Sequence, residues 1–379
     1  MFTYSTQPRG SVVHAACLSE ALARRAEEVT LFALSKNQGR LFREVACRVQ
    51  LLPAAEAPAE LDALIAQRIA ELVRALSELA PELDVLHAQD CLVASALLEA
   101  RRRSRALARC PLLRTVHHVE RFESPYLAEC QRRSISEADE VLTVSRTTDD
   151  DVWQAFRRRG LRVSNGVDVA RFASAAARAG DARHALGLGA DAFVVLSVGG
   201  VEQRKNSLRC LEAMSRVQAE APDVVWLIAG GASVLDHRAY QAEFESRVAA
   251  LPPMVRCRVR RTGIVSEQEL TDLYGASDML LCASEHEGFG LCVLEAAAAR
   301  RPVVVSRQPP FTEYLPDRAA LFVDPKSPDA IASAVLRLRG SPGLRARLAE
   351  LGHAIARELT WERSAAEHSR AYRLALGLD

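Results

Sequence analysis

Short apolar strands alternate with amphipathic helical stretches along this chain, and the series runs twice. In the first half, strands are predicted at 2–5, 29–34, 85–87, 112–116 and 141–145. In the second half, they are predicted at 193–198, 224–229, 255–260, 279–282, 303–306 and 321–323. Alternation of this kind predicts a parallel sheet with helices on both faces. We therefore expect an α/β protein of two Rossmann-like, doubly wound domains with a cleft between them.

The length of 379 residues also suits two domains, because single hydrophobic cores rarely grow that large. We expect a first domain at 1–170 and a second domain at 191–358. Residues 171–190 mix Ala, Gly, Arg and Asp without a core pattern, which indicates a connection between the domains. The last part of the chain is strongly amphipathic, and we expect a helix at 359–379 that packs back on the first domain.

Composition argues against several classes of protein. The formal net charge is +1, so no overall field would recruit nucleic acid or an acidic membrane. Nine cysteines occur without a Cys-x-x-Cys pair, which favours reduced thiols and argues against a zinc site. No apolar run is long enough for a transmembrane helix. We expect a cytoplasmic protein, and the sequence leaves open both its oligomeric state and a peripheral association with the inner face of a membrane.

A glycine-containing turn between two carboxylates precedes an alanine-rich helix. Glu287 begins the turn, Gly288 and Gly290 lie within it, and Glu295 follows inside the predicted helix. Glycines permit close approach of a ligand to the backbone, and a helix start offers unpaired N–H groups and a positive dipole end. The pattern therefore predicts an anion site bordered by both carboxylates. The alternative is a glycine-terminated loop with two solvated glutamates.

Arg204 and Lys205 follow another predicted strand end and its Gly200. Only three of the 49 basic residues are lysines, and Lys205 is one of them. A paired cation at the carboxyl end of a strand suits a diphosphate, since arginine offers a planar fork and lysine a point charge. An exposed helix start with stray charges is the alternative, but it would place cations at the unfavourable end of the helix dipole.

Polar residues also follow the strands predicted in the first half. His87, Asp90, His117 and Ser145 come at or just after strand ends, where open α/β sheets bind ligands. The pair His117 and His118 lacks the companions of a metal site, and hydrogen-bonded structural histidines are the alternative. The sequence lacks the Gly-x-Gly-x-x-Gly motif of dehydrogenases after its first strands, and it lacks the P-loop of kinases. It also lacks Gly-x-Ser-x-Gly, which argues against a serine hydrolase.

The ordered set of motifs resembles family 4 glycosyltransferases with the GT-B fold. The signature is Glu287-Gly288-Phe289-Gly290 with Glu295, a Glu-x7-Glu pattern, followed by Arg301-Pro302-Val303-Val304. The likeness covers nearly the whole chain and includes Gly10-Ser11, His117, Asn165-Gly166-Val167-Asp168, Arg204-Lys205, Thr262-Gly263, Leu273-Tyr274 and Thr360-Trp361.

The resemblance implies transfer of a sugar from a nucleotide-diphosphate sugar of the UDP or GDP type. It further implies retention of the anomeric configuration and no metal or other cofactor. The second domain would bind the donor, and the first would bind a small-molecule, glycan or lipid acceptor. The donor residues implied are Gly10, Gly200, Arg204, Lys205, Gly263, Glu287, Gly288, Phe289, Gly290, Leu291 and Glu295.

The roles of these residues follow from the same resemblance. Glu295 would hold the ribose hydroxyls, and Glu287 would hold the donor sugar together with the backbone of 289–291. Arg204 and Lys205 would neutralise the departing diphosphate, and His117 would lie over the reacting sugar. Fixed cations suit this step, because breaking the sugar–phosphate bond builds negative charge on the diphosphate.

Two features depart from the pattern of the family, and the acceptor stays undefined. Many relatives carry an arginine where this chain has Gly200, and the glycine pair of the first loop is here Gly10-Ser11. The candidate residues on the acceptor side are Arg9, His87, Asp90, His118 and Tyr126. A nucleotide-sugar epimerase of the same fold and a non-catalytic protein that binds sugar nucleotides are the alternative functions.

Overall fold

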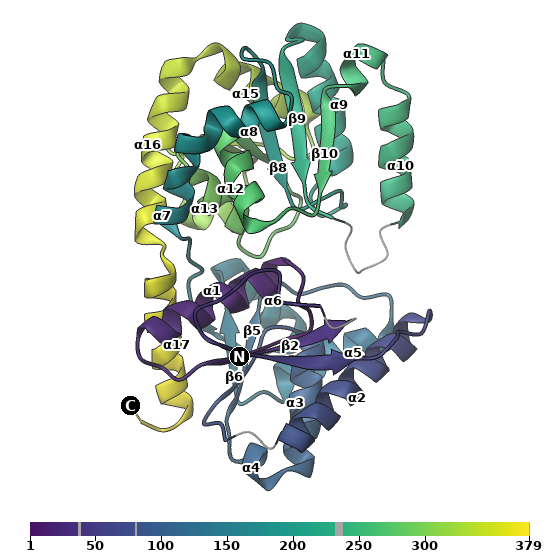
Figure 1. Ribbon diagram of the computed structural model, residues 1–379, viewed down its shortest axis with the longest axis vertical. Coiled ribbons are helices and arrows are strands. Elements are labelled where there is room, and N and C mark those ends of the chain that lie inside the picture. The colour runs from purple at the N-terminus through teal and green to yellow at the C-terminus, as the bar shows by residue number, and fades with distance from the viewer. Residues whose placement is uncertain (37–38, 80–81, 232–237, 379) are drawn as a thin grey trace. The chain divides into compact units, whose positions relative to one another are not determined.

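A computed structural model describes residues 1–36, 39–79, 82–231 and 238–378. The chain forms two compact units (Figure 1). Unit 1 comprises 1–165 together with 361–379, and unit 2 comprises 166–360. Val167 and Thr360 form an isolated parallel bridge. The segment by which the chain enters unit 2 therefore lies beside the segment by which it leaves.

Unit 1 is built on a seven-stranded parallel sheet, which confirms the predicted doubly wound architecture. Its strand order is β3-β2-β1-β4-β5-β6-β7, which reverses direction beside β1 as Rossmann-type sheets do. The strands are β1 (Phe2–Thr3), β2 (Thr30–Lys36), β3 (Arg48–Ala54), β4 (Leu86–Ala88), β5 (Leu112–Val116), β6 (Glu140–Thr143) and β7 (Leu161–Arg162). The strand β3 was not predicted from the sequence, and it contains Pro53, which an edge strand tolerates because one side of its backbone needs no partner.

Helices cover both faces of this sheet. They are α1 (Gly10–Arg24), α2 (Leu61–Leu79), α3 (Cys91–Arg103), α4 (Arg105–Ala108), α5 (Pro125–Ser136), α6 (Arg146–Phe156) and α17 (Trp361–Ala375). Although α17 ends the chain, it belongs to unit 1 and packs against α1. Asp90, Ser124 and Ser145 cap the starts of α3, α5 and α6 by accepting a hydrogen bond from a backbone N–H of the first turn. Ser145, predicted among the polar strand ends, is thus a helix cap.

Unit 2 contains the second predicted sheet. Its six parallel strands follow the order β10-β9-β8-β11-β12-β13. They are β8 (Phe193–Val198), β9 (Val224–Ala229), β10 (Val259–Gly263), β11 (Met279–Cys282), β12 (Val303–Ser306) and β13 (Leu321–Val323). The helices are α7 (Val169–Ala173), the 3-10 turn η1 (Ser174–Arg178), α8 (Ala179–Ala185), α9 (Ser207–Glu220), α10 (Arg238–Ala249), α11 (Pro253–Arg256), α12 (Glu267–Ala276), α13 (Leu291–Ala298), α14 (Phe311–Tyr314), α15 (Pro328–Gly340) and α16 (Pro342–Glu358).

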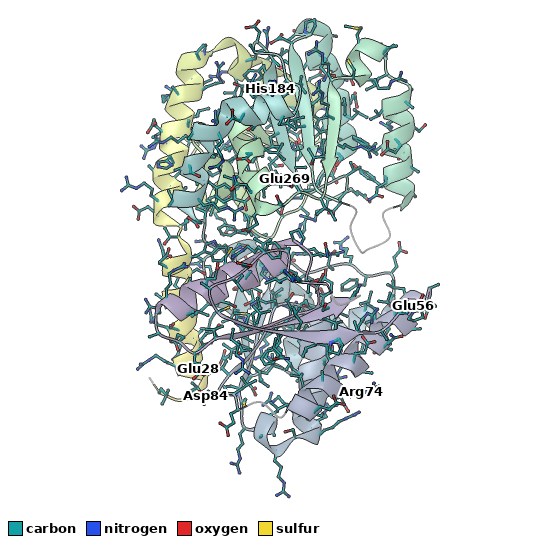
Figure 2. The ribbon with its side chains drawn as sticks, viewed as in Figure 1. Glu28, Glu56, Arg74, Asp84, His184 and Glu269 are labelled. Atoms are coloured by element: carbon teal, nitrogen blue, oxygen red, sulfur yellow. The ribbon has the colours of Figure 1, made fainter. Side chains whose placement is uncertain are left out.

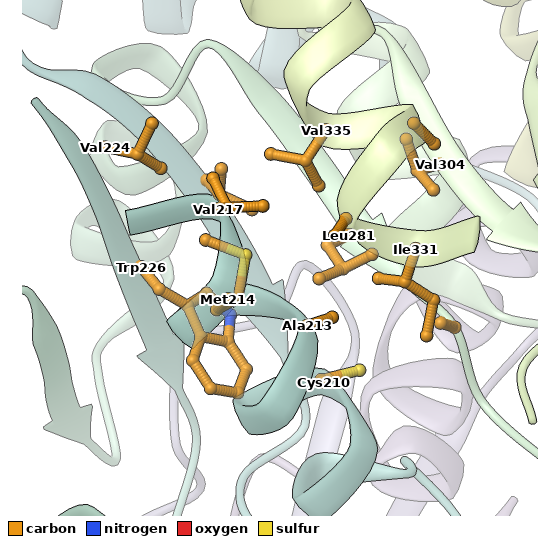
Figure 3. Packing of buried hydrophobic residues seen from close by; sticks show 14 of the residues in the cluster. Cys210, Ala213, Met214, Val217, Val224, Trp226, Leu281, Val304, Ile331 and Val335 are labelled. Atoms are coloured by element: carbon orange, nitrogen blue, oxygen red, sulfur yellow. The ribbon is translucent and has the colours of Figure 1, made fainter. Parts of the chain in front are cut away.

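The core of unit 2 explains why its strands read as continuous apolar runs. Both faces of a parallel sheet are covered, so nearly every side chain of the four inner strands, β8, β9, β11 and β12, is buried. On one face, α9 and α15 pack together over the sheet, with Met214, Trp226, Leu281 and Val335 among the buried side chains (Figure 3).

Two predictions about unit 2 were wrong. The strand expected at 255–260 begins at Val259, because Pro253 starts the short helix α11, a position that proline favours. Residues 171–190, expected as a connection, lie within unit 2 and form α7, η1 and α8, of which η1 and α8 pack on α12. They anchor there partly through ion pairs, such as Arg178 with Asp272, so the segment needs little apolar pattern of its own.

Charged side chains cover the outside of both units. Figure 2 labels exposed examples, among them Glu28, Arg74 and Glu269. None of the nine cysteines, all within the described residues, forms a disulfide bond. None of the helices within the described ranges combines the length and the apolar character that crossing a bilayer requires.

Candidate functional site

Three neighbouring strands of unit 2 end in glycines that pack against one another. Gly199 and Gly200 follow β8 with positive φ, and both donate backbone hydrogen bonds to Ala229 at the end of β9. A Cβ atom on Gly200 would lie 2.4 Å from the carbonyl oxygen of Gly231. Gly230 donates its N–H to the carbonyl of Gly263, which ends β10. Gly200 stands where many relatives carry an arginine. In this chain the glycine has a steric reason, because any side chain at this position would collide with the backbone after β9.

Lys205 and Arg204 both reach the carboxylate of Glu287. Lys205 Nζ donates to Glu287 Oε1, and Arg204 Nη1 lies 3.0 Å from the same oxygen. Ser284 adds a hydrogen bond of 3.2 Å from its Oγ, a contact that the sequence did not predict. The side chains of Lys205 and Glu287 are 14% and 8% exposed, so this is a buried ion pair. The structure thus brings Arg204 and Lys205 against Glu287, which lies 82 positions after Lys205 in the sequence.

The electrostatics of the cluster keep all of these groups charged. Burial alone would favour the neutral form of Glu287, but Lys205 and Arg204 outweigh it and lower the pKa to about 2. Burial likewise opposes the charge of Lys205, and the Glu287 carboxylate overcomes this and raises the lysine pKa. Glu202 Oε2 lies 3.2 Å from Arg204 Nη2, so the two cations are balanced by two carboxylates within the cluster. Their N–H groups are donors that an anionic ligand can also use.

The turn that presents Lys205 is held by Asn206. This residue adopts a left-handed conformation with a φ of 59°, which asparagine tolerates better than most residues. Its side-chain amide donates to the carbonyl oxygens of Ala283 and Pro325 at 3.0 and 2.6 Å. The backbone N–H of Glu285 also donates to the carbonyl of Arg204. These bonds join the turn after β8 to the turn after β11, so the cations and Glu287 are held in fixed relative positions.

The helix α13 begins directly after Gly290, as the sequence predicted. Gly290 is the residue before the helix and has a φ of 86°, and a Cβ there would lie 2.5 Å from the ring of Phe311. Phe289 stacks on Tyr314 with ring centroids 5.0 Å apart. No side chain caps the helix start within the described structure of this turn, so N–H groups of its first turn remain for a ligand.

Glu295 lies one turn further along α13. The hydroxyl of Tyr274 donates to Glu295 Oε2 at 2.7 Å and also lies 3.1 Å from the carbonyl of Cys292. Burial raises the pKa of Glu295, while Tyr274 and the positive charges of Arg171 and Lys205 act in the opposite direction.

The arrangement in the second unit suits an anionic ligand such as a diphosphate. Two cations, an open helix start and close-packed glycine turns all lie at the carboxyl ends of parallel strands, where α/β folds bind nucleotides. The loop around Ile264, on which Gly231 packs, borders the same strand ends.

His117 belongs to unit 1, whereas Lys205 and Glu287 belong to unit 2. Its Nε2 lies 2.9 Å from Gln89 Oε1, which indicates a donated hydrogen bond, and its ring meets that of His14 edge to face at 4.8 Å. Its contact with the reacting sugar stays a prediction. The same holds for Gly10, which begins α1 with no neighbour within 4 Å of a hypothetical Cβ and without a positive φ.

Four histidines of unit 1 lie close together, one on α17 and three on the elements that it covers. They are His14, His87, His117 and His368. Burial lowers the pKa of each, to about 3 for His14 and to about 4 for His368, so the group is neutral near pH 7. Among the described residues, no three His, Cys, Asp or Glu side chains are arranged to hold a metal ion.

Two of the candidate residues on the acceptor side are structural. His87 is 2% exposed, and its ring nitrogens lie 2.7 Å from the hydroxyls of Tyr372 and Thr115, so no nitrogen is left for an acceptor. A strand residue is buried when its face is covered, and α17, distant in sequence, supplies that cover. Asp90 caps α3 and accepts the N–H of Tyr4. These two predictions are corrected accordingly.

The other three candidates on this side are at least partly exposed. Arg9 donates to the hydroxyl of Tyr4 at 3.0 Å, His118 contacts Glu120 at 2.5 Å, and Tyr126 is 37% exposed near the start of α5. Their contact with an acceptor stays a prediction.

Two family models match this chain. Residues 180–354 match the model described as glycosyl transferases group 1, and residues 8–171 match glycosyltransferase family 4. Among curated proteins, a D-inositol 3-phosphate glycosyltransferase of Acidothermus cellulolyticus is 31% identical over 288 residues, covering 70% of this chain and 62% of the relative. One from Salinispora arenicola is 29% identical, covering 67% of this chain and 61% of the relative. The match therefore spans about three fifths of the length of these two relatives.

Solved structures share the fold over the whole chain. A sucrose-phosphate synthase from Thermosynechococcus elongatus has a TM-score of 0.81 and 21% identity, covering 100% of this chain and 98% of that one. The Anabaena protein HepE in complex with UDP and glucose has a TM-score of 0.77 and 19% identity, covering 98% and 97%. At these identities the likeness shows the fold, which is the predicted one.

Proposed function

Because the chain belongs to the group 1 glycosyltransferases, we propose that it transfers a sugar from a nucleoside-diphosphate sugar to an acceptor, with retention and without a metal. The observation that carries the proposal is the cluster of Lys205, Arg204 and Glu287 beside the open start of α13. Solved structures of HepE in complex with UDP and with UDP-glucose support UDP as the nucleotide.

The cluster would act mainly on the leaving diphosphate. As the bond between the sugar and the phosphate breaks, negative charge grows on the diphosphate. Lys205 and Arg204 are already charged and held in place, so they stabilise this charge without having to reorganise. The N–H groups at the start of α13 would contribute in the same direction.

Glu287 and Glu295 would have different tasks. Glu287 keeps its charge and lies on the cations, where its second oxygen would accept a hydrogen bond from a sugar hydroxyl. Glu295 is oriented by Tyr274, which leaves its carboxylate to accept the ribose hydroxyls. Both tasks are polar contacts to hydroxyl groups, which a buried carboxylate makes strongly.

To test this, the protein is incubated with UDP-glucose, UDP-N-acetylglucosamine or GDP-mannose in the presence of EDTA, and sugar transfer is measured. An inositol phosphate is the first acceptor, because the relatives are D-inositol 3-phosphate glycosyltransferases. NMR of the product would show the donor anomer retained. Lys205→Ala would abolish turnover, and Lys326→Ala, an exposed lysine of the same unit, would not.

Other results of this experiment would contradict the proposal. Interconversion of the sugar without any acceptor would indicate an epimerase. Tight binding of the donor without transfer to any acceptor would indicate a non-catalytic protein.

A further inference from the structure

Two cysteines of unit 2 lie side by side on either side of the turn that carries Glu287. Cys282 ends β11, and Cys292 is the second residue of α13. Their Sγ atoms are 3.9 Å apart, and the side chains are buried. Glu287 and Gly290 lie in the chain between them. Nothing in the proposed transfer reaction uses either thiol.

The two thiols have unlike surroundings. Cys292 donates its S–H to Cys282 Sγ, and the Ser284 hydroxyl lies 3.5 Å from the same sulfur. The bond from Cys292 lowers the pKa of Cys282, burial opposes it, and the nearby Lys205 charge lowers it further. The pKa of Cys292 is raised because it is the donor and is buried. Cys282 is thus the more acidic of the two thiols.

A small cavity lies beside the more acidic of the two. Cys282 lines a cavity of about 20 Å³, together with Gly200, Lys205, Cys210 and Ser284. A cavity of roughly 10–15 Å³ or more by this measure holds one water molecule. Hydrogen peroxide, with two oxygen atoms, is only slightly larger. Cys210, on α9, belongs to the hydrophobic core of unit 2 that Figure 3 shows.

We propose that Cys282 and Cys292 form an oxidisable dithiol, a modification site for hydrogen peroxide. The Cys282 thiolate attacks one peroxide oxygen, the O–O bond breaks, and with one proton taken up the products are a sulfenic acid and water. Cys292 then attacks the sulfenic sulfur, a second water leaves, and a disulfide forms. The two sulfurs together lose two electrons and the peroxide gains them. A small thiol reverses the reaction by exchange.

The disulfide would also change the nucleotide site, a consequence that rests on the proposed function. A disulfide bond is about 2.05 Å long, so the two sulfur atoms, at the end of β11 and near the start of α13, must approach each other by roughly 2 Å. Glu287 and the helix start lie on the turn between these two points. Displacement of binding groups by about 1 Å costs up to roughly a hundredfold in function. We expect oxidation to weaken UDP binding at least tenfold.

The test oxidises reduced protein with hydrogen peroxide, maps disulfides by peptide mass spectrometry and measures UDP affinity by calorimetry. The wild type should form a Cys282–Cys292 peptide, lose UDP affinity and recover it with dithiothreitol. Cys292→Ser should instead accumulate a sulfenic acid at Cys282 that dimedone traps. Cys257→Ser, which removes an exposed thiol, should behave as the wild type.

Three outcomes would overturn the proposal. The disulfide could be missing from the wild type, it could form only after unfolding in urea, or it could form while UDP affinity stays unchanged. If Cys292→Ser is unstable, Cys292→Ala serves in its place. Reduced wild type that does not bind UDP would contradict the proposed function, and the mass spectrometry would still decide whether the dithiol reacts.

Discussion

Replacing Glu287 with glutamine should destabilise unit 2 by about 3 kcal/mol at neutral pH. The Lys205 and Arg204 charges lower the pKa of Glu287 from 4.5 to about 2, which corresponds to about 3 kcal/mol of preference for the charged form. Glutamine resembles the protonated acid in shape and lacks the charge, so it loses this amount and leaves Lys205 buried without its partner. For a domain of this size, the loss corresponds to a fall in Tm of about 6–12 °C.

The assay is calorimetric unfolding at several pH values, with Glu285→Gln as the matched control. Glu285 lies two positions away and pairs with Arg209, but both side chains are about one-third exposed or more, so its loss should cost under about 1 kcal/mol. The sign of the pH dependence is also fixed. Because the folded-state pKa of Glu287 is lowered, its stabilisation is complete above about pH 4.5 and disappears as the pH falls toward about 2.

The two variants must therefore differ for the reasoning to hold. Equal losses for Glu287→Gln and Glu285→Gln near pH 7 would refute a buried, stabilising ion pair. A difference between wild type and Glu287→Gln that persists undiminished below pH 4 would refute the electrostatic explanation in particular.

Three further perturbations test other parts of the structure. Gly200→Ala should destabilise unit 2 by about 1–3 kcal/mol, because Gly200 has a positive φ and the new Cβ would collide with the backbone. Gly343→Ala, which has open space around the new Cβ, should leave stability unchanged, and thermal unfolding compares the two variants. Tyr274→Phe should weaken UDP binding in calorimetry, because Glu295 loses the hydrogen bond that orients it, and an unchanged Kd would count against that role. The buried histidines His14, His87 and His368, neutral in folded unit 1, should each cost up to about 2 kcal/mol between pH 7 and pH 5, because folding lowers their pKa and stability is lost as the pH falls below about 6.5. Urea titrations should show a shallower loss of stability in acid for His368→Gln, and an equal loss would contradict this.

The sequence predicted best those elements whose signals are local. Strands such as β8 and β12 are unbroken apolar runs between glycines and charged residues, and their bounds agree with the structure. Proline obscured two others, since Pro53 lies inside β3 and Pro253 begins a helix where a strand was expected. Edge strands and short helices depend on neighbours more than on their own pattern, so periodicity alone does not reveal them.

At the candidate site, residue types were predictable and their partners were not. The glycine turn, the two glutamates and the Arg204-Lys205 pair were all expected to contact a ligand. The ion pair of Lys205 with Glu287 depends on the turns after β8 and β11, which meet only in the folded sheet. The side chain of Asn206 holds these two turns together. His87 is the opposite case, because its burial comes from α17, nearly three hundred residues later in the chain.

Calorimetric titration of the reduced protein with UDP tests the central claim most directly. We predict saturable binding by the wild type and by Lys326→Ala. Lys205→Met keeps most of the side-chain volume, and we predict that its affinity is lower by tenfold or more, because it lacks the charge that meets the diphosphate. Equal UDP affinity in Lys205→Met and wild type, or no binding by the wild type, would contradict the claim that this cluster is the diphosphate site.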